Sequence, residues 1–324
     1  MKKTVALVYG GDSSEAEVSA RSGRHLAREI DRERYQVYEI MIKGRDWKVL
    51  LEDGTSPQID KADFSFIYPS QPRSRRVTFD IALIMIHGTP GENGRLQAYF
   101  EMIGIPFTTC SAVVSAITFD KYATKCYLRD TGIKLAPDIL VRRGDRYNPS
   151  EIVAKLGLPL FIKPNEGGSS FGTTKVKSVE EVAPALELAF KEGDAVIAEE
   201  FIPGRELTNG VYENNGELVR LPVTEIIPKN EFFDYEAKYL GASSEVCPAE
   251  ISKETAKNVI DVTHRLYRYL GCRGVVRMDY ILKGEELYFL EINTVPGMTE
   301  VSLVPQQIRA TGKSISSFLT ELLG

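Results

Sequence analysis

The 324-residue chain has few of the residues that mark several large classes of protein. Its four cysteines include no CxxC pair, so neither a disulfide framework nor a cysteine zinc site is predicted. Three histidines, at positions 25, 87 and 264, are not spaced as metal ligands. No run of 18 apolar residues occurs, which argues against a membrane-spanning helix. The net charge of −5 argues against nucleic-acid binding as the main activity.

The composition that remains is that of an ordinary globular protein. With 43% hydrophobic and 26% charged residues, the chain is long enough for two or three domains with cores of their own. Two lysines near the N-terminus precede a strand-like run that ends in Gly-Gly, which is too short and wrongly followed for a signal peptide. We therefore expect a cytoplasmic protein.

Two apolar, strand-like runs within residues 275–293 carry polar side chains in an alternating pattern. Alternate residues of a strand share a face, so Arg277 groups with Asp279, and Glu291 with Asn293. If the runs pair antiparallel, Asp279, Glu291 and Asn293 can converge on divalent cations. Such oxygens suit Mg²⁺, which takes its other ligands from water and substrate phosphates. Taken alone, the two runs leave an ordinary surface hairpin equally open.

Near the N-terminus, the apolar runs 5–9, 35–42 and 79–86 are typical of strands buried in a parallel sheet. The first enters the turn 10–15 and then a helical pattern, and the N-terminus of such a helix can receive an anion or polar ligand. The turn lacks the third glycine of a dinucleotide fingerprint. The third run ends at the glycine-rich segment 87–94, where doubly wound sheets bind ligands. A ligand-binding role is favoured for His87 in this segment, and a structural histidine bonded to backbone is the less favoured alternative.

The middle of the chain predicts one long helix over 111–130 and a strand over 158–164. The Gly/Ser loop 165–172 and a strand-like stretch at 174–177 follow. Backbone N–H groups and hydroxyls in such a loop can cradle phosphates, and Lys163 supplies charge. The loop is not a Walker A motif, and a plain hairpin turn explains it equally well.

Residues 195–206 form an apolar strand that runs into paired acids, an aromatic residue and a Pro-Gly turn. This pattern indicates an interdomain crossing with groups available to an adenine and a ribose. The polar and aromatic segment 225–248 is long for a loop and indicates a lid or binding loop. Helical periodicity at 252–270 and at about 302–322 predicts scaffold helices.

Six motifs in order resemble the ATP-grasp enzymes, and most closely the D-alanine–D-alanine ligases, over essentially the whole chain. They lie at 10–19, 87–94, 120–121, 163–172, 234–239 and 291–299. Two positions depart from the family pattern: Gly167, where an acid is frequent, and Glu200, where lysine is frequent. The implied α/β architecture is an N-terminal doubly wound domain over 1–106, followed by two α+β domains, 107–203 and 204–324, that sandwich ATP.

The resemblance implies ATP-dependent ligation of two D-alanines through an acyl phosphate, for peptidoglycan synthesis. ATP would be bound by Lys121, Lys163, Ser170, Glu199, Glu200, Phe201, Ile202, Glu206 and Lys238. Asp279, Glu291 and Asn293 would hold two Mg²⁺ or Mn²⁺ ions. Glu15 would bind the first ammonium group, with Ser169 and Tyr239 joined to Glu15 by hydrogen bonds. Arg277 and the Gly297 N–H would stabilise the oxyanion. Substrate would also contact His87, Ser302 and Leu303.

The implied partners are ATP, D-alanine and a second copy of the chain, with neither nucleic acid nor membrane insertion. Synthesis of D-alanyl-D-lactate or D-alanyl-D-serine stays open, as does another ATP-grasp carboxylate–amine ligation. Tyr239 favours an amine nucleophile, because phenylalanine accompanies the ester-forming members of the family. A regulatory nucleotide-binding protein without turnover is disfavoured by the intact polar set around Arg277, and a dehydrogenase by the missing dinucleotide glycines.

Overall fold

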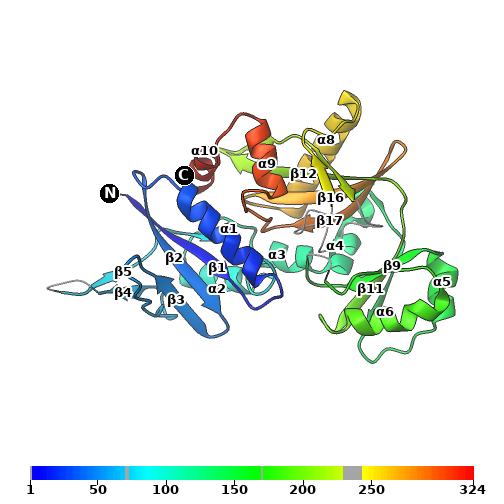
Figure 1. Ribbon diagram of the computed structural model, residues 1–324, viewed down its shortest axis with the longest axis horizontal. Coiled ribbons are helices and arrows are strands. Elements are labelled where there is room, and N and C mark those ends of the chain that lie inside the picture. The colour runs from blue at the N-terminus through cyan, green and yellow to red at the C-terminus, as the bar shows by residue number, and fades with distance from the viewer. Residues whose placement is uncertain (1, 70–72, 169–170, 229–242) are drawn as a thin grey trace.

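The computed structural model describes residues 2–69, 73–168, 171–228 and 243–324. Three main sheets follow one another along its longest axis (Figure 1). The N-terminal sheet lies at one end, the sheet from the middle of the chain at the other, and the C-terminal sheet between them. Within the described ranges, no helix is both long and apolar enough to cross a membrane.

The N-terminal sheet has the strand order β3-β2-β1-β6. Its strands are β1 (Lys3–Gly10), β2 (Tyr35–Lys43), β3 (Asp46–Leu50) and β6 (Ile81–Ile84). β1 pairs parallel with β2 and β6, whereas β3 is an antiparallel edge strand that the sequence did not predict. Helix α1 (Ala16–Glu29) shares one apolar cluster with Leu7 of β1, and α2 (Arg95–Ile103) shares another with Val8. Burial of both faces explains the continuous apolar runs and confirms the doubly wound prediction.

A small hairpin of β4 (Phe66–Tyr68) and β5 (Arg75–Val77) extends from this sheet. The middle sheet has the order β10-β9-β11-β8 and is antiparallel throughout. Its strands are β8 (Asp138–Arg142), β9 (Leu160–Pro164), β10 (Thr174–Val176) and β11 (Ala195–Glu200). Helices α5 (Pro149–Leu156) and α6 (Val182–Ala189), with the short 3-10 turn η2 (Val179–Glu181), cover it. The predicted strand–loop–strand unit around the glycine-rich loop is confirmed.

The C-terminal sheet runs β15-β14-β12-β16-β17-β7, with β13 paired to β12. Its strands are β7 (Lys134–Leu135), β12 (Arg205–Asn214), β13 (Glu217–Arg220), β14 (Thr224–Pro228), β15 (Ser243–Val246), β16 (Val276–Lys283) and β17 (Glu286–Asn293). Helix α8 (Lys253–Leu270) packs on one apolar face, as predicted. The segment 225–248 is not one loop, because its two ends are the paired strands β14 and β15. Residues 229–242 of the expected lid lie outside the described ranges.

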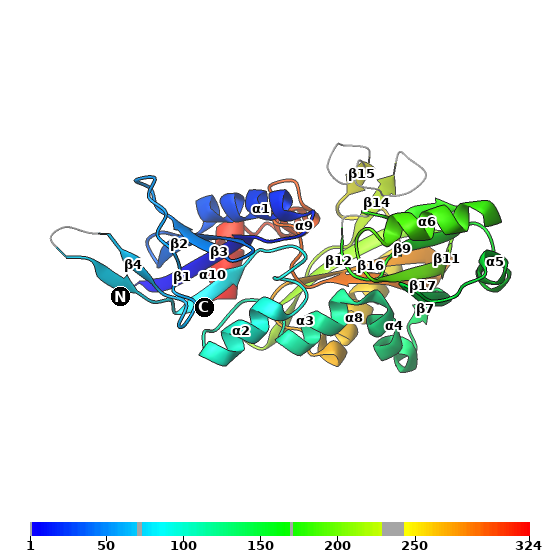
Figure 2. The ribbon, with the colours of Figure 1, turned by 90° about the horizontal axis from the view of Figure 1, so that it is seen from below.

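The predicted single helix over 111–130 is wrong. Asp120 leaves the helical region, with φ −83° and ψ 107°, and its side chain accepts from the N–H of Ala123 at 2.7 Å. This cap ends α3 (Ala112–Phe119) and begins α4 (Lys121–Leu128), which the turn η1 (Arg129–Thr131) follows. Lys121 therefore occupies the first position of a helix. Seen from below, α2, α3, α4 and α8 lie along one side of the molecule (Figure 2).

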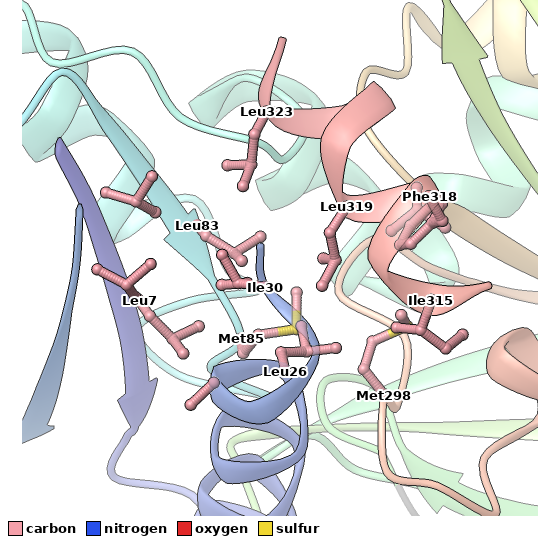
Figure 3. Close-up of a cluster of buried hydrophobic side chains, with 14 of the residues drawn as sticks. Leu7, Leu26, Ile30, Leu83, Met85, Met298, Ile315, Phe318, Leu319 and Leu323 are labelled. Atoms are coloured by element: carbon pink, nitrogen blue, oxygen red, sulfur yellow. The ribbon is translucent and has the colours of Figure 1, made fainter. Parts of the chain in front are cut away.

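The predicted C-terminal helix is also two helices, α9 (Leu303–Ala310) and α10 (Ile315–Leu323). Gly312, at φ 82°, ends the first of them. Figure 3 shows α10 returning to the N-terminal sheet, where Phe318 and Leu319 join the apolar cluster of Leu26. The domain boundaries at 106 and 203 stay predictions. Helix α10 follows both boundaries in the chain but packs against elements that precede residue 106. Met298, in the segment before α9, belongs to the same apolar cluster.

Candidate functional site

The hairpin β16–β17 brings together the four polar residues predicted from its alternating pattern. Asp279 lies opposite Glu291, and Arg277 opposite Asn293, in antiparallel register. Intervening apolar residues such as Met278 face α8, which leaves the polar set on the other face of the sheet. The expected antiparallel pairing is confirmed. The period of two in the sequence predicts only that the polar residues of each strand share a face.

Asp279 is the centre of this polar set. Arg277 donates to it twice, from Nε at 2.9 Å and from Nη2 at 2.7 Å. The Thr208 hydroxyl donates at 2.5 Å and the Asn293 amide at 3.2 Å. A buried carboxylate with four donor contacts is well fixed, so Asp279 holds Arg277 in a defined orientation. The contribution of Thr208 was not predicted, since nothing in its local sequence distinguishes it.

The same set can hold a divalent cation only with help from a ligand. Asp279 and Glu291 supply two carboxylates and Asn293 an amide oxygen, which are hard donors suited to Mg²⁺. Among the residues that the structure describes, no cluster of three His, Cys, Asp or Glu side chains forms a metal site. Two carboxylates with one amide suit an ion that takes its remaining ligands from phosphate and water.

A cleft of about 380 Å³ lies between the middle sheet and the C-terminal sheet. Seven of the nine predicted nucleotide-binding residues line it: Lys121, Lys163, Glu199, Glu200, Phe201, Ile202 and Glu206. Its apolar walls include Phe161, Ile281 and Phe289, which sequence reasoning missed because they look like ordinary core positions of strands. A cleft with apolar walls that is also lined by Lys121 and Lys163 suits a nucleotide.

Buried charges hold the cationic end of this cleft. The Glu199 carboxylate lies 2.6 Å from Lys125 and 2.5 Å from Lys163, and Lys125 also pairs with Asp138 at 2.9 Å. Burial alone would raise the pKa of Glu199, but the two lysines lower it to about 2. The Glu199 side chain thus orients Lys163. Sequence reasoning assigned no role to Lys125 or Asp138, although Lys125 lies one helical turn after Lys121.

Lys121 and Lys163 differ in their electrostatic surroundings. Burial acts to lower the pKa of Lys163, but the charges of Glu199 and Glu291 outweigh it and raise that pKa. Burial lowers the pKa of Lys121, whose ammonium group donates to the Gly167 carbonyl at 2.7 Å. Burial thus disfavours the charged form of Lys121. An anion bound beside it would offset this cost, because a nearby negative charge favours the ammonium form.

A second, smaller cavity of about 110 Å³ adjoins the cleft. Six predicted residues that act on or bind the amino acids line it: Glu15, His87, Arg277, Gly297, Ser302 and Leu303. Lys121, Gly167, Gly168 and Glu291 line both spaces. The two spaces therefore meet beside the polar set of the hairpin.

Glu15 and the glycine-rich loop approach each other closely. The Glu15 carboxylate is 8% exposed, and a Cβ atom placed on Gly168 would lie 2.8 Å from its Oε2. Any larger residue at position 168 would therefore require the Glu15 carboxylate to move. Gly167 adopts φ 107°, which disfavours the acid that is frequent in the family at this position.

The turn that carries Gly297 is held by side chains of α1 and of the loop between β6 and α2. Val295 is bound through both backbone groups: its carbonyl accepts from His87 Nδ1 at 2.8 Å, and its N–H lies 3.4 Å from a Glu92 oxygen. Met298 is bound in the same way, because its N–H donates to Ser22 at 3.1 Å and its carbonyl accepts from His25 at 2.7 Å. We call these four side chains the clamp.

The clamp forms one connected set of hydrogen bonds. Since His87 Nδ1 donates to a carbonyl, its Nε2 accepts from the Ser22 hydroxyl at 3.1 Å. Burial lowers the pKa of His87, which favours this neutral form. His87 thus lines the cavity and also bonds to backbone. Ser22, His25 and Glu92 were missed, because their partners are some 200 or more residues away in the chain.

Glu92 is the acidic member of the clamp. It accepts from the Gly88 N–H at 2.8 Å and is 8% exposed. Burial, and next the charge of Glu15, raise its pKa to about 8. The two backbone N–H groups act to lower this pKa, but burial outweighs them and favours the neutral side chain.

The start of α9 closes the cavity. The Ser302 hydroxyl contacts the Thr299 hydroxyl at 2.7 Å and accepts from its N–H at 3.0 Å. Ser302 makes no side-chain cap to α9, so the first N–H groups of that helix face a position where a carboxylate is favoured. The predicted residues Ser169, Ser170, Lys238 and Tyr239 lie outside the described ranges.

Comparison with known proteins agrees with this geometry. The family model described as "D-ala D-ala ligase N-terminus" matches residues 4–110, and "D-ala D-ala ligase C-terminus" matches residues 127–324. The D-alanine–D-alanine ligase of Phocaeicola vulgatus is 48% identical over 324 residues, with 100% of this chain and 99% of the relative covered. That of Bacteroides fragilis strain ATCC 25285 is 46% identical at the same coverage.

Solved structures give the same result for the fold. The VanG D-Ala:D-Ser ligase from Enterococcus faecalis superposes with a TM-score of 0.87 at 31% identity, covering 100% of this chain and 99% of its own. The D-alanine–D-alanine ligase from Bacillus anthracis complexed with ATP has a TM-score of 0.78 at 28% identity, covering 99% and 96%. The ATP-grasp prediction is thereby confirmed. Fold, full-length relatives and matched models agree that this chain belongs to the D-alanine–D-alanine ligase family.

Proposed function

We propose that the protein joins two D-alanine molecules into D-alanyl-D-alanine, with conversion of ATP to ADP and phosphate, for peptidoglycan synthesis. One observation carries the proposal: the nucleotide cleft and the smaller cavity meet at Glu291, beside Arg277 and Asp279. A reaction in which ATP activates a small carboxylate needs two such adjoining sites. The names of the full-length relatives support the same activity.

In the first step, a carboxylate oxygen of one D-alanine attacks the γ-phosphorus of ATP. The bond from that phosphorus to the bridging oxygen breaks, and ADP leaves with the electron pair. Lys121 and Lys163, at the cleft's cationic end, would stabilise the charge on the transferring group. Glu15 would bind the ammonium group of this first D-alanine.

In the second step, the amine of the other D-alanine, having lost a proton, attacks the carbonyl of the acyl phosphate. The nitrogen then loses a second proton to solvent, and collapse of the tetrahedral intermediate expels phosphate and leaves the amide. Arg277 and the Gly297 N–H would stabilise the oxyanion, and both line the smaller cavity. The start of α9, at Ser302 and Leu303, would receive the second carboxylate. The clamp holds Val295 and Met298, on either side of Gly297. The Gly297 N–H would therefore need to move little when the oxyanion forms.

Two Mg²⁺ or Mn²⁺ ions would be held by Asp279, Glu291 and Asn293 together with phosphate oxygens. Bound there, such ions supply charge neutralisation for phosphoryl transfer. The donor set fits this role, because it offers hard oxygens in numbers too small for a closed metal site.

The direct test is ADP and dipeptide formation with D-alanine, D-serine and D-lactate as second substrates. We expect ADP release to depend on both D-alanine and Mg²⁺, with D-alanyl-D-alanine as the main product. Equal ADP release without D-alanine would contradict the ligase activity. The likeness to a D-Ala:D-Ser ligase makes D-alanyl-D-serine the second candidate, and a dominant D-serine product would select it.

We further propose that the protein acts as a homodimer in the cytoplasm, where its substrate ATP is made. Two exposed apolar side chains on the neighbouring helices α2 and α3 support self-association: Met102 is 86% exposed and Val113 68%. Charged replacements of both residues should give monomers in analytical ultracentrifugation. Leu188→Glu, an exposed position on α6, is the control. A wild-type monomer at micromolar concentration would contradict the dimer.

A further inference from the structure

One acidic side chain in the smaller cavity has no part in the steps above. Glu245, on β15, lines the cavity with Arg277, Gly297 and Ser302. It lies opposite Ile226 of β14, at the sheet edge farthest from β17. An acid at this place needs a physical reason, because it borders the space assigned to the second amino acid, whose own carboxylate is negative.

Glu245 is held toward the position where that carboxylate would bind. Gln306, in the first turn of α9, donates to Glu245 Oε2 at 2.5 Å and to the Val301 carbonyl at 2.8 Å. The acid is therefore tied to the same helix start that presents Ser302 and Leu303. Partial burial raises the pKa of Glu245, whereas the bond from Gln306 and the charge of Arg277 act to lower it.

Two carboxylates that border one small cavity repel each other unless a cation lies close to both. Arg277 already donates twice to Asp279, so its charge is shared. D-Alanine brings a cation of its own, the ammonium group. D-Lactate has the same size and shape but carries a hydroxyl there and is a net anion.

Resting on the proposed function, we infer that Glu245 is a specificity-determining residue of the second subsite. Its carboxylate attracts the ammonium group of an incoming amino acid and repels a hydroxy acid. The substrate class selected is the zwitterion, bound before the amine loses its proton for attack. Selection is the difference between the affinities of the subsite for the amino acid and for the hydroxy acid, and it needs no contact with ATP.

Competition between second substrates tests this inference. Wild type, Glu245→Gln and the control Glu217→Gln receive ATP, D-alanine and D-lactate, and the dipeptide and depsipeptide are separated by chromatography. Glu217 is exposed on β13, so the control removes one negative charge away from the cavity. For Glu245→Gln we expect the ratio of depsipeptide to dipeptide to rise about tenfold, as loss of a like-charge repulsion predicts. The KM for ATP should stay unchanged.

An unchanged product ratio in Glu245→Gln, or an equal rise in Glu217→Gln, would overturn the inference. If Glu245→Gln does not fold, as judged by circular dichroism, a competition experiment on the wild-type enzyme tests the inference instead. D-2-Aminobutyrate should then compete with the second D-alanine more strongly than D-2-hydroxybutyrate, and equal inhibition constants would overturn the inference. Absence of any ADP and dipeptide from wild type would instead overturn the proposed function.

Discussion

The two adjoining spaces are fixed by different physical means. In the nucleotide cleft, Lys125 and Lys163 are positioned by the buried carboxylate of Glu199. In the smaller cavity, the backbone of Val295 and Met298 is positioned by side chains from the other end of the chain. The first arrangement relies on charge, and the second on mostly neutral hydrogen bonds across a domain junction.

This difference matches what each space must offer. A polyphosphate needs fixed positive charges, and buried lysines keep theirs only beside carboxylates. An oxyanion that forms briefly needs a fixed N–H donor, and a backbone donor is fixed by binding its neighbours. The two spaces should therefore respond differently to mutation, and the variants below test that expectation in order of decreasing effect.

The largest effect is expected where the two spaces meet. Glu291→Gln keeps the size of the side chain but removes a charge that we assign to metal binding. Activity should fall about 10³-fold, since a bound metal supplies several kcal/mol of charge stabilisation. The melting temperature should change little. Steady-state ADP release across a Mg²⁺ series is the measurement.

Glu286→Gln is the matched control, because Glu286 lies on the same strand but is exposed. Its activity should equal that of wild type. Normal turnover of Glu291→Gln at saturating Mg²⁺ would remove Glu291 from the metal site.

Breaking the ion pairs around Glu199 in the nucleotide cleft should lower the free energy of unfolding. Glu199→Gln leaves Lys163 without its carboxylate partner, and breaking a buried ion pair costs about 3–5 kcal/mol. Because the pKa of Glu199 is lowered to about 2, the wild-type protein should lose this stability as the pH falls from about 4.5 toward 2. Denaturant unfolding at several pH values measures both effects.

Asp194→Asn serves as the control for this loss. Asp194 pairs with Arg143, but its side chain is 89% exposed, so the cost should stay below about 1 kcal/mol. If the two variants were equally stable, the buried network would contribute no more than a surface pair.

Removing one hydrogen bond of the clamp should have a smaller effect. Ser22→Ala leaves the Met298 N–H and His87 Nε2 without their shared hydroxyl. An unsatisfied buried group costs about 1–3 kcal/mol, and we expect kcat to fall about tenfold with the KM for ATP unchanged. Ser316→Ala, on α10 and away from the cavity, is the control. A change in the KM for ATP or D-alanine with kcat unchanged would show that the clamp does not position the oxyanion donor.

The sequence predicted those parts of the site that depend on local periodicity. The alternation around Asp279 and Glu291 gave the correct face, because strand geometry repeats every two residues. The antiparallel pairing is an assumption that the structure confirms. The apolar run of β1 likewise indicated burial on both faces. The six ordered motifs gave the family, and through it most residues that line the two spaces.

The rest depended on contacts that no local pattern encodes. Ser22 and His25 lie on an ordinary amphipathic helix, and their partner Met298 is more than 270 residues away. Helix breaks at Asp120 and Gly312 were missed because the apolar pattern continues through both positions. A side-chain cap at the first, and a positive φ at the second, interrupt what periodicity alone predicts to be continuous.

The smallest effect, and the sharpest contrast with Glu199, is expected at Glu92. Its pKa is raised from 4.5 to about 8, by burial first and by Glu15 second. The folded protein therefore binds one more proton than the unfolded chain between these pH values, so wild-type stability should fall as the pH rises through this window. Glu92→Gln removes the titration, and the free energy of unfolding of the variant should depend less on pH there. Near pH 6 both side chains are neutral, and the two proteins should differ by only about 1 kcal/mol. Urea unfolding between pH 5 and pH 9 is the measurement, and parallel pH profiles of the two proteins would contradict a neutral Glu92 in the clamp.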